Sequence, residues 1–162
     1  MNGALSTAPV VQGLFEGQGD DTRLLASRCR GCGSVFFPRS LSCRHPRCTD
    51  KAPQDILLGP QGTLYSFTVQ AYRPPPLFVM DDWAPYALGL IELPEGLRVM
   101  AMLTGRAPQD WRIGEPMALT TGVLSRDGEG REVLTYQFRP LAAAGAATTA
   151  IPGAISTEGA SA

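Results

Sequence analysis

Residues 29–48 read CRGCGSVFFPRSLSCRHPRC and contain all four cysteines of the chain, Cys29, Cys32, Cys43 and Cys48. The first pair forms a Cys-x2-Cys turn followed by Gly33. Such a turn aims two thiolates at one ion, and the glycine permits a backbone turn that a side chain would hinder. A second cysteine pair a short loop later completes a tetrahedral four-sulfur site. The stretch therefore predicts a zinc knuckle.

The ligand set and the metal leave alternatives open. Four residues separate Cys43 from Cys48, which is at the wide end of the usual spacing, and His45 lies among them. The ligands are thus four thiolates, which we favour, or three thiolates and one imidazole. A four-thiolate knuckle can hold iron as well as zinc. Two disulfides or four ordinary thiols are the remaining alternatives. The first twenty residues lack the basic start and apolar run of a secretory signal, so we expect a cytoplasmic protein in which the clustered cysteines bind a metal.

The metal is predicted to be structural. A closed four-thiolate site leaves no open position for water or substrate. His45 is the only histidine and lies within the knuckle, so a Ser-His-Asp triad is not expected. The neighbouring Asp81 and Asp82 could serve as acid and base, but adjacent loop carboxylates are more often solvated surface. We therefore expect no catalytic residues on this chain.

Composition narrows the range of functions. The chain has 162 residues, room for one modest domain and an appendage, with a formal net charge of -1. A pI near 5.8 argues against a general nucleic-acid binder. The sequence contains no run of about 18 apolar residues, so no transmembrane span is expected. Arginine accounts for all but one of the 14 basic residues, and it suits planar phosphate or carboxylate partners, although these side chains could simply be solvated. Six arginines surround the knuckle: Arg23, Arg28, Arg30, Arg39, Arg44 and Arg47.

Short elements are predicted around the knuckle. Residues 1–9 resemble a flexible lead-in, and residues 10–17 predict a short helix with Val11, Leu14 and Phe15 on one face. Strands are predicted at 23–28 and 34–37, the second ended by Pro38. Residues 49–60 are interpreted as a linker with a short strand at 56–58. The expected division is an N-terminal segment (1–22), a zinc ribbon (23–58), a barrel (59–140) and a tail (141–162).

From residue 62 onward the sequence alternates in the manner of β-strands. Turn signals at 94–96 and 126–130 define two hairpins. Five strands in about 80 residues favour a small barrel over a large sandwich. Gly89, inside a strand, indicates the sharp coiling that small barrels need. The predicted strands span residues 63–72, 85–93, 97–104, 117–124 and 132–138.

Two further segments are predicted to meet a partner. The loop after the first barrel strand is apolar and stiffened by proline, and such a loop covers its own barrel or is buried in another chain; we favour the second. Its residues are Pro74, Pro75, Pro76, Leu77, Phe78, Met80 and Trp83. Residues 141–162 consist mostly of Ala, Gly, Ser and Thr and cannot form a core. We expect this tail to dock on a partner.

Several motifs resemble one known family. In chain order they are CRGCGSVFFPR, C-x4-C, GTLYSFTV, APYALGLIELPEGLRVMAMLTG, RIGEPMAL and a final strand ending YQFRP. Over about residues 10–140 they resemble the family catalogued as domain of unknown function 35 (DUF35). The resemblance implies a mainly β protein, with a rubredoxin-like zinc ribbon followed by a five-stranded OB-fold barrel. The chain departs from the family pattern in two places. Its second knuckle is C-x4-C, whereas C-x2-C is common in the family, and its tail is not part of the shared pattern.

The resemblance also implies a function. Members of this family are non-catalytic subunits that dock on a thiolase-fold catalytic subunit and help to hold the coenzyme A ester. Partners include acetoacetyl-CoA thiolase with HMG-CoA synthase in archaea, a steroid side-chain aldolase, and (S)-2-benzoylsuccinyl-CoA thiolase of anaerobic toluene degradation. The short form of this chain is most similar to the thiolase subunits, benzoylsuccinyl-CoA thiolase in particular. A 2:2 heterotetramer is expected from the dimers that thiolases form.

Three residues are predicted to contact acyl-CoA. Phe37 and Arg39 directly follow the first knuckle, and Arg73 precedes the triple proline. Arginine forms charge-assisted bonds to phosphate, and an aromatic or guanidinium plane can stack on adenine. The competing interpretation of Phe36 and Phe37 is ordinary core packing between knuckle and barrel.

Single-stranded nucleic-acid binding is the alternative function, because OB barrels bind strands through aromatic side chains in basic grooves. Tyr65, Phe67, Tyr72 and Tyr136 could serve as stacking platforms. They are more simply interpreted as barrel residues, and residues 62–140 carry little excess positive charge. This alternative is the less favoured one.

Overall fold

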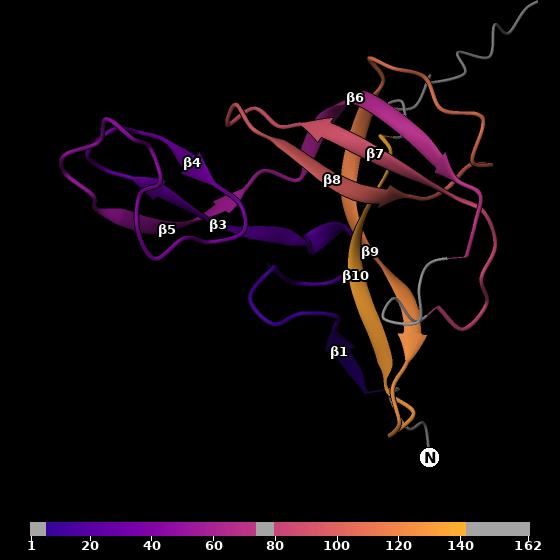
Figure 1. The fold of residues 1–162 in the computed structure, drawn as a ribbon. Coiled ribbons are helices and arrows are strands. Elements are labelled where there is room, and N and C mark those ends of the chain that lie inside the picture. The colour runs from indigo at the N-terminus through magenta and orange to yellow at the C-terminus, as the bar shows by residue number, and fades with distance from the viewer. Residues whose placement is uncertain (1–5, 74–79, 142–162) are drawn as a thin grey trace, which may run out of the picture.

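The second half of the chain forms a closed five-stranded barrel (Figure 1). This computed structural model describes residues 6–73 and 80–141. Around the barrel, neighbouring strands pair in the order β6–β7–β8–β10–β9 and back to β6, and the β8–β10 pair is parallel. This order confirms the predicted OB-fold barrel. The strands are β6 (Gln61–Gln70), β7 (Tyr86–Glu92), β8 (Arg98–Leu103), β9 (Pro116–Arg126) and β10 (Glu132–Pro140).

Alternation along the strands decides which side chains fill the barrel. In β7, Ala87, Gly89 and Ile91 are buried, whereas the residues between them are half-buried on the outer face. A register shift between Leu64 and Ser66 bends β6 around the barrel. Such local bends allow five short strands to close into a ring.

A second sheet forms the zinc ribbon, which extends away from the barrel (Figure 1). Its central strand is β3 (Arg23–Cys29), which pairs antiparallel with each of the other three. The partners are β2 (Phe15–Glu16), β4 (Val35–Phe36) and β5 (Pro53–Leu58). The last of these occupies much of the stretch interpreted as a linker, because Leu24 to Cys29 pair along its whole length.

The predicted helix at residues 10–17 is wrong. Gly13 and Gly17 have φ angles of 80° and 77°, in the left-handed region that no α-helix uses. Phe15 instead pairs with Leu24 as part of β2 and is buried in the core. A short 3-10 turn, η1 (Gly19–Asp21), is the one helical element of the described chain.

The lead-in also contains a strand that the sequence did not indicate. β1 (Thr7–Pro9) pairs in parallel with β10, and the Val10 N–H donates to the Leu134 carbonyl at 2.7 Å. Residues 74–79 of the predicted proline-rich loop and the tail from residue 142 lie outside the described residues, whereas Met80 and Trp83 of that loop are half-buried. No helix in the described part of the chain is long and apolar enough to span a membrane.

One apolar core runs through both the ribbon and the barrel. Leu24 and Leu58 of the ribbon strands belong to the same buried cluster as Ile91 and Phe138 of the barrel, and all four have no exposed surface. The base of the ribbon is therefore fixed to the barrel by packing, whereas the buried cysteines, the first of which ends β3, form a separate small cluster.

Candidate metal centre

The ribbon strands and two loops bring the four cysteines together. Cys29 ends β3, and the chain turns back at once, with the Gly33 N–H donating to the Cys29 carbonyl at 2.7 Å. Gly33 has a φ of 74°, as its place after the Cys-x2-Cys pair predicts. Cys43 and Cys48 lie in the loop between β4 and β5, where the Cys48 N–H donates to the carbonyl of His45.

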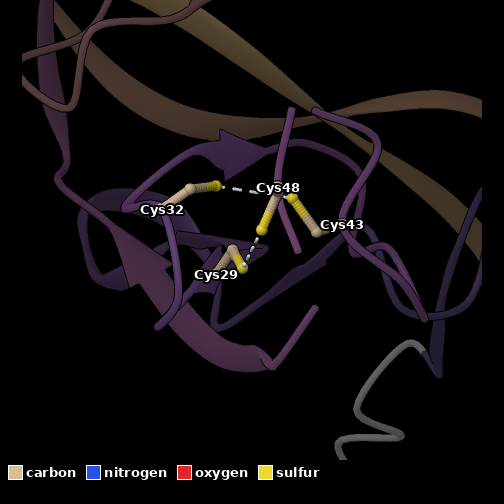
Figure 2. Close-up of side chains that lie close together, drawn as sticks. All are labelled: Cys29, Cys32, Cys43 and Cys48. Carbon is tan, nitrogen blue, oxygen red and sulfur yellow. Dashed lines mark hydrogen bonds between the residues drawn. The ribbon is translucent and has the colours of Figure 1, made fainter. Parts of the chain in front are cut away.

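The sulfur geometry fits one tetrahedral ion (Figure 2). All four Sγ atoms lie within 4.8 Å of one another. The Sγ atoms of Cys29 and Cys48 are 3.7 Å apart, and those of Cys32 and Cys43 are 3.5 Å apart. Four sulfurs around zinc at about 2.3 Å lie about 3.8 Å from each other, so the observed spacing matches a zinc tetrathiolate. A disulfide needs an S–S distance of about 2.0 Å, and all four cysteines are free thiols.

The geometry also decides between the two ligand sets. In the described chain, the cluster of ligand atoms consists of the four sulfurs and does not include the His45 imidazole. The His45 side chain is exposed, and its backbone N–H donates to Cys43 Sγ at 3.4 Å. His45 thus shapes the turn of the second knuckle, and the wide spacing that made it a candidate ligand is accommodated by this loop.

The protein environment shifts the pKa values of the thiols in different directions. For Cys29, burial acts to raise the pKa, but the backbone N–H groups of Cys32, Ala52 and Gly31 outweigh it and lower the pKa to about 6. Burial raises the pKa of Cys48 to about 12 and raises that of Cys43. A metal that binds here must therefore displace protons from the two buried thiols of the second knuckle.

Gly31 is a residue of the site that the sequence analysis missed. A Cβ atom at this position would overlap the backbone carbonyl of Asp50, which also lies 3.4 Å from Cys29 Sγ and 3.2 Å from Cys48 Sγ. The first knuckle can approach residue 50 this closely only because residue 31 has no side chain. The signal was present in the sequence as the glycine directly before the second cysteine of the Cys-Arg-Gly-Cys turn.

The two aromatic residues after the first knuckle contact different parts of the molecule. Phe36 packs against the buried cysteines, and the Arg44 guanidinium lies 5.1 Å from the centre of its ring. Phe37 faces the barrel, where its ring meets Tyr136 edge-on at 5.7 Å between centroids. Phe37 therefore joins the ribbon to the barrel, which is the competing interpretation that the sequence left open.

Of the predicted acyl-CoA contacts, Phe37 and Arg39 are close in sequence and Arg73 lies in the barrel half of the chain. Arg39 is exposed and forms a 2.8 Å ion pair with Asp55 of β5. Arg73 is exposed beside the loop that starts at residue 74. The assignment of Phe37, Arg39 and Arg73 to coenzyme A stays a prediction.

The other sequence candidates serve local structure. Asp81 accepts the Arg126 N–H at 2.7 Å, so this carboxylate fixes the end of β9. Among the candidate stacking platforms, Phe67 packs against the core, and burial raises the pKa of Tyr136, whose hydroxyl donates to the Met100 carbonyl. Arg98 covers the Tyr65 ring at 3.4 Å. Of the four candidate stacking platforms, Tyr65 and Tyr72 stay exposed, and Arg98 already lies over the Tyr65 ring.

The knuckle and the barrel together define a zinc-ribbon OB-fold protein, and comparisons with known proteins agree. The family model described as the rubredoxin-like zinc ribbon domain of ChsH2 matches residues 18–53. The model described as the C-terminal OB-fold domain of ChsH2 matches residues 56–122.

Known proteins resemble the chain across both parts. A DUF35 domain-containing scaffold protein of Methanocaldococcus jannaschii is 31% identical over 120 residues, which cover 73% of this chain and 82% of the relative. Benzoylsuccinyl-CoA thiolase subunit BbsA of Thauera aromatica is 33% identical over 116 residues, covering 70% and 74%. A solved structure titled Ltp2-ChsH2(DUF35) aldolase matches with a TM-score of 0.56 and 32% identity, over 73% of this chain and 84% of that one. The chain belongs to the DUF35 family.

Proposed function

We propose that this chain is the accessory subunit of a thiolase-type acyl-CoA enzyme. The observation that carries the proposal is the similarity to a thiolase subunit, at 33% identity over 70% of this chain. In such a complex the catalytic subunit supplies the cysteine nucleophile and the histidines for proton transfer. The four cysteines of this chain converge on one metal position, and its single histidine lies in the second knuckle.

The accessory subunit acts by positioning. A zinc-fixed ribbon joined to a barrel by a continuous core is a rigid body, which can hold one wall of a thioester cleft in place. Zinc supplies structural stability in this arrangement, because four thiolates close its coordination.

The acyl-CoA thioester contacts the accessory subunit near Arg73. Arg73 is exposed, and a guanidinium group forms charge-assisted hydrogen bonds to phosphate. Arg39 must break its ion pair with Asp55 to bind a phosphate. The Phe37 ring already contacts Tyr136, so an adenine ring would have to stack beside that contact. Among the residues that the structure describes, Arg73 is thus the predicted contact with the fewest competing partners.

The particular enzyme we propose is (S)-2-benzoylsuccinyl-CoA thiolase, as a 2:2 heterotetramer. Two relatives named as subunits of that enzyme support it, from Thauera aromatica and Geobacter metallireducens. An aldolase-type catalytic partner is the second candidate, and the match to the solved aldolase structure favours it.

Reconstitution tests the proposal. A thiolase-fold subunit is assayed for thioester cleavage alone and with this chain, using benzoylsuccinyl-CoA and a steroid side-chain thioester in parallel. We expect turnover only with both chains present, and the preferred thioester separates thiolase from aldolase. Equal turnover without this chain would contradict an accessory role.

A variant tests the coenzyme A contact. Arg73→Ala should raise the KM for the thioester by about tenfold, as expected for one lost charge-assisted phosphate bond, with zinc content and melting temperature unchanged. Arg112→Ala, an exposed arginine elsewhere on the barrel, is the matched control. An unchanged KM in Arg73→Ala would remove this residue from the site.

A further inference from the structure

Three aliphatic side chains are exposed on one side of the zinc ribbon. Val11 and Leu57 are 53% and 50% exposed, and Leu41 is fully exposed. Asp55 and Leu57 are both exposed, lie on either side of the half-buried Ile56 in β5, and share one face of that strand. Val11, Leu41 and Asp55 line the same hollow, of about 580 Å³, between the segment before β2 and the loop after β4. We call Val11, Leu41 and Leu57 the ribbon face.

The metal end of the ribbon carries unpaired positive charge. Each of its five cations lies within three positions of a metal-ligand cysteine, so their backbones surround one point at the far end of the ribbon. In the described parts of the chain, none of the five takes part in a salt bridge. Their five positive charges exceed the three negative charges beside them, which are the two of a zinc tetrathiolate and the one of Asp50. These cations, which we call the basic end, are Arg28, Arg30, Arg44, Arg47 and Lys51.

The two features adjoin, since Leu41 stands three residues before Arg44 in the same loop. Protein interfaces combine an apolar centre with a polar rim in which arginine is enriched. An aliphatic centre gives nucleic-acid bases no stacking surface, whereas the bidentate guanidinium suits carboxylates. Four of the five cations are arginines. The combination therefore fits an acidic protein surface better than a polynucleotide.

We propose that the ribbon face and the basic end dock on an acidic surface of the catalytic subunit. The inference rests on the function proposed above and adds the surface of this chain that is used and the charge of its partner. Leu41 inserts at the centre of the contact, and Arg44 and Arg47 pair with carboxylates at its rim. The arginines are evident in the sequence, whereas the signal of Leu41 was a single leucine between two serines in a polar loop.

Binding between the two full-length subunits tests the surface. The dissociation constant is measured by calorimetry at low and high salt for the wild type and two variants, Leu41→Glu and the double variant Arg44→Glu, Arg47→Glu. Leu41→Glu should raise Kd more than about tenfold, as for a central anchor residue. The double variant should raise Kd about tenfold at low salt and less at high salt, because the lost attraction is screened.

Matched controls come from the barrel. Met100→Glu introduces the same charge at another apolar side chain, 63% exposed on the outer face, and Arg112→Glu reverses a distant exposed charge. Both should keep Kd within about twofold, the range of surface changes outside an interface. Zinc content and circular dichroism confirm that each variant folds.

The outcomes separate the two proposals. A wild-type complex that the ribbon variants leave intact, but that Met100→Glu weakens, would overturn the docking surface and keep the proposed function. Absence of a wild-type complex would overturn both. If the double variant instead abolished binding of a single-stranded oligonucleotide and left subunit binding unchanged, the basic end would be a nucleic-acid site and the inference would fail.

Discussion

At the residue scale, the metal site depends on the sulfur atoms and on the backbone that surrounds them. Within the described residues, Phe36 is the one hydrophobic side chain outside the cluster that packs against the buried cysteines, so the metal end of the ribbon depends mainly on its thiolates for stability. Structural zinc sites of this kind supply about 10–16 kcal/mol at neutral pH. Loss of one ligand should therefore have a larger effect than loss of any surface contact.

Cys43→Ser should weaken zinc binding by about 100-fold or more, as expected if each of four ligands supplies about a quarter of the binding free energy. His45→Ala, in the same loop, should keep one zinc per chain because the imidazole lies outside the sulfur cluster. Zinc per chain is measured by mass spectrometry of the metal after dialysis against a chelator. Equal zinc loss in His45→Ala would place the imidazole among the ligands.

The thiol pKa values predict how zinc binding depends on pH. Near pH 7 Cys29 is already mostly thiolate, with a pKa of about 6, whereas Cys48, with a pKa of about 12, is protonated. Zinc binding at pH 7 should release fewer than four protons, and the affinity should fall as pH decreases because protons compete for the sulfurs. Calorimetry in buffers of different ionisation enthalpy counts the protons. Release of all four would show that the metal-free ribbon does not hold Cys29 in this environment.

At the element scale, the barrel was the most predictable part of the chain. Period-two alternation and turn signals located all five strands to within three residues at each end, because one face of every strand fills the core. The hairpin at Asp127 shows why turn chemistry is reliable. Its carboxylate accepts the Glu129 and Arg131 N–H groups and pairs with the Arg131 side chain.

The N-terminal segment was not predictable in the same way. The apolar spacing of Val11, Leu14 and Phe15 matches a helix, but Gly13 and Gly17 adopt left-handed conformations that let Phe15 reach Leu24. Tertiary pairing with β3 decided this conformation, and local spacing carries no information on it. In the same way, the sequence identified the four cysteines, whereas the partners of Phe37 and the exposure of Leu41 follow from packing.

Gly89 tests the close packing of the barrel strands. A Cβ atom at this position would lie 2.6 Å from Cδ2 of Leu103, so Leu103 must move to accommodate it. Gly89→Ala should lower the free energy of unfolding by about 1–3 kcal/mol, the usual cost of overpacking a core. Gly128→Ala, with no atom within 4 Å of the added carbon, is the control and should leave stability unchanged or slightly higher. Denaturant titration measures both, and equal stabilities would refute the tight contact.

At the scale of the whole molecule, Phe37 couples the ribbon to the barrel. Phe37→Ala should lower the free energy of unfolding by about 2 kcal/mol, below the 3–5 kcal/mol of a fully buried phenylalanine. Tyr136→Phe keeps the aromatic contact and loses only the hydroxyl bond to Met100, so its cost should stay near 1 kcal/mol. Thermal unfolding measures both variants. If Phe37→Ala kept full stability and only raised the KM for the thioester, the residue would be a coenzyme A contact rather than a joint.

The central claim concerns assembly, since the family, the rigid ribbon–barrel unit and the exposed ribbon face all point to a subunit that works within a larger enzyme. Native mass spectrometry of the gently purified protein tests it most directly. We predict a stoichiometric 2:2 complex with a thiolase-fold chain and one zinc ion per copy of this subunit. A zinc-bearing monomer that still forms no complex when mixed with such a chain would contradict the account.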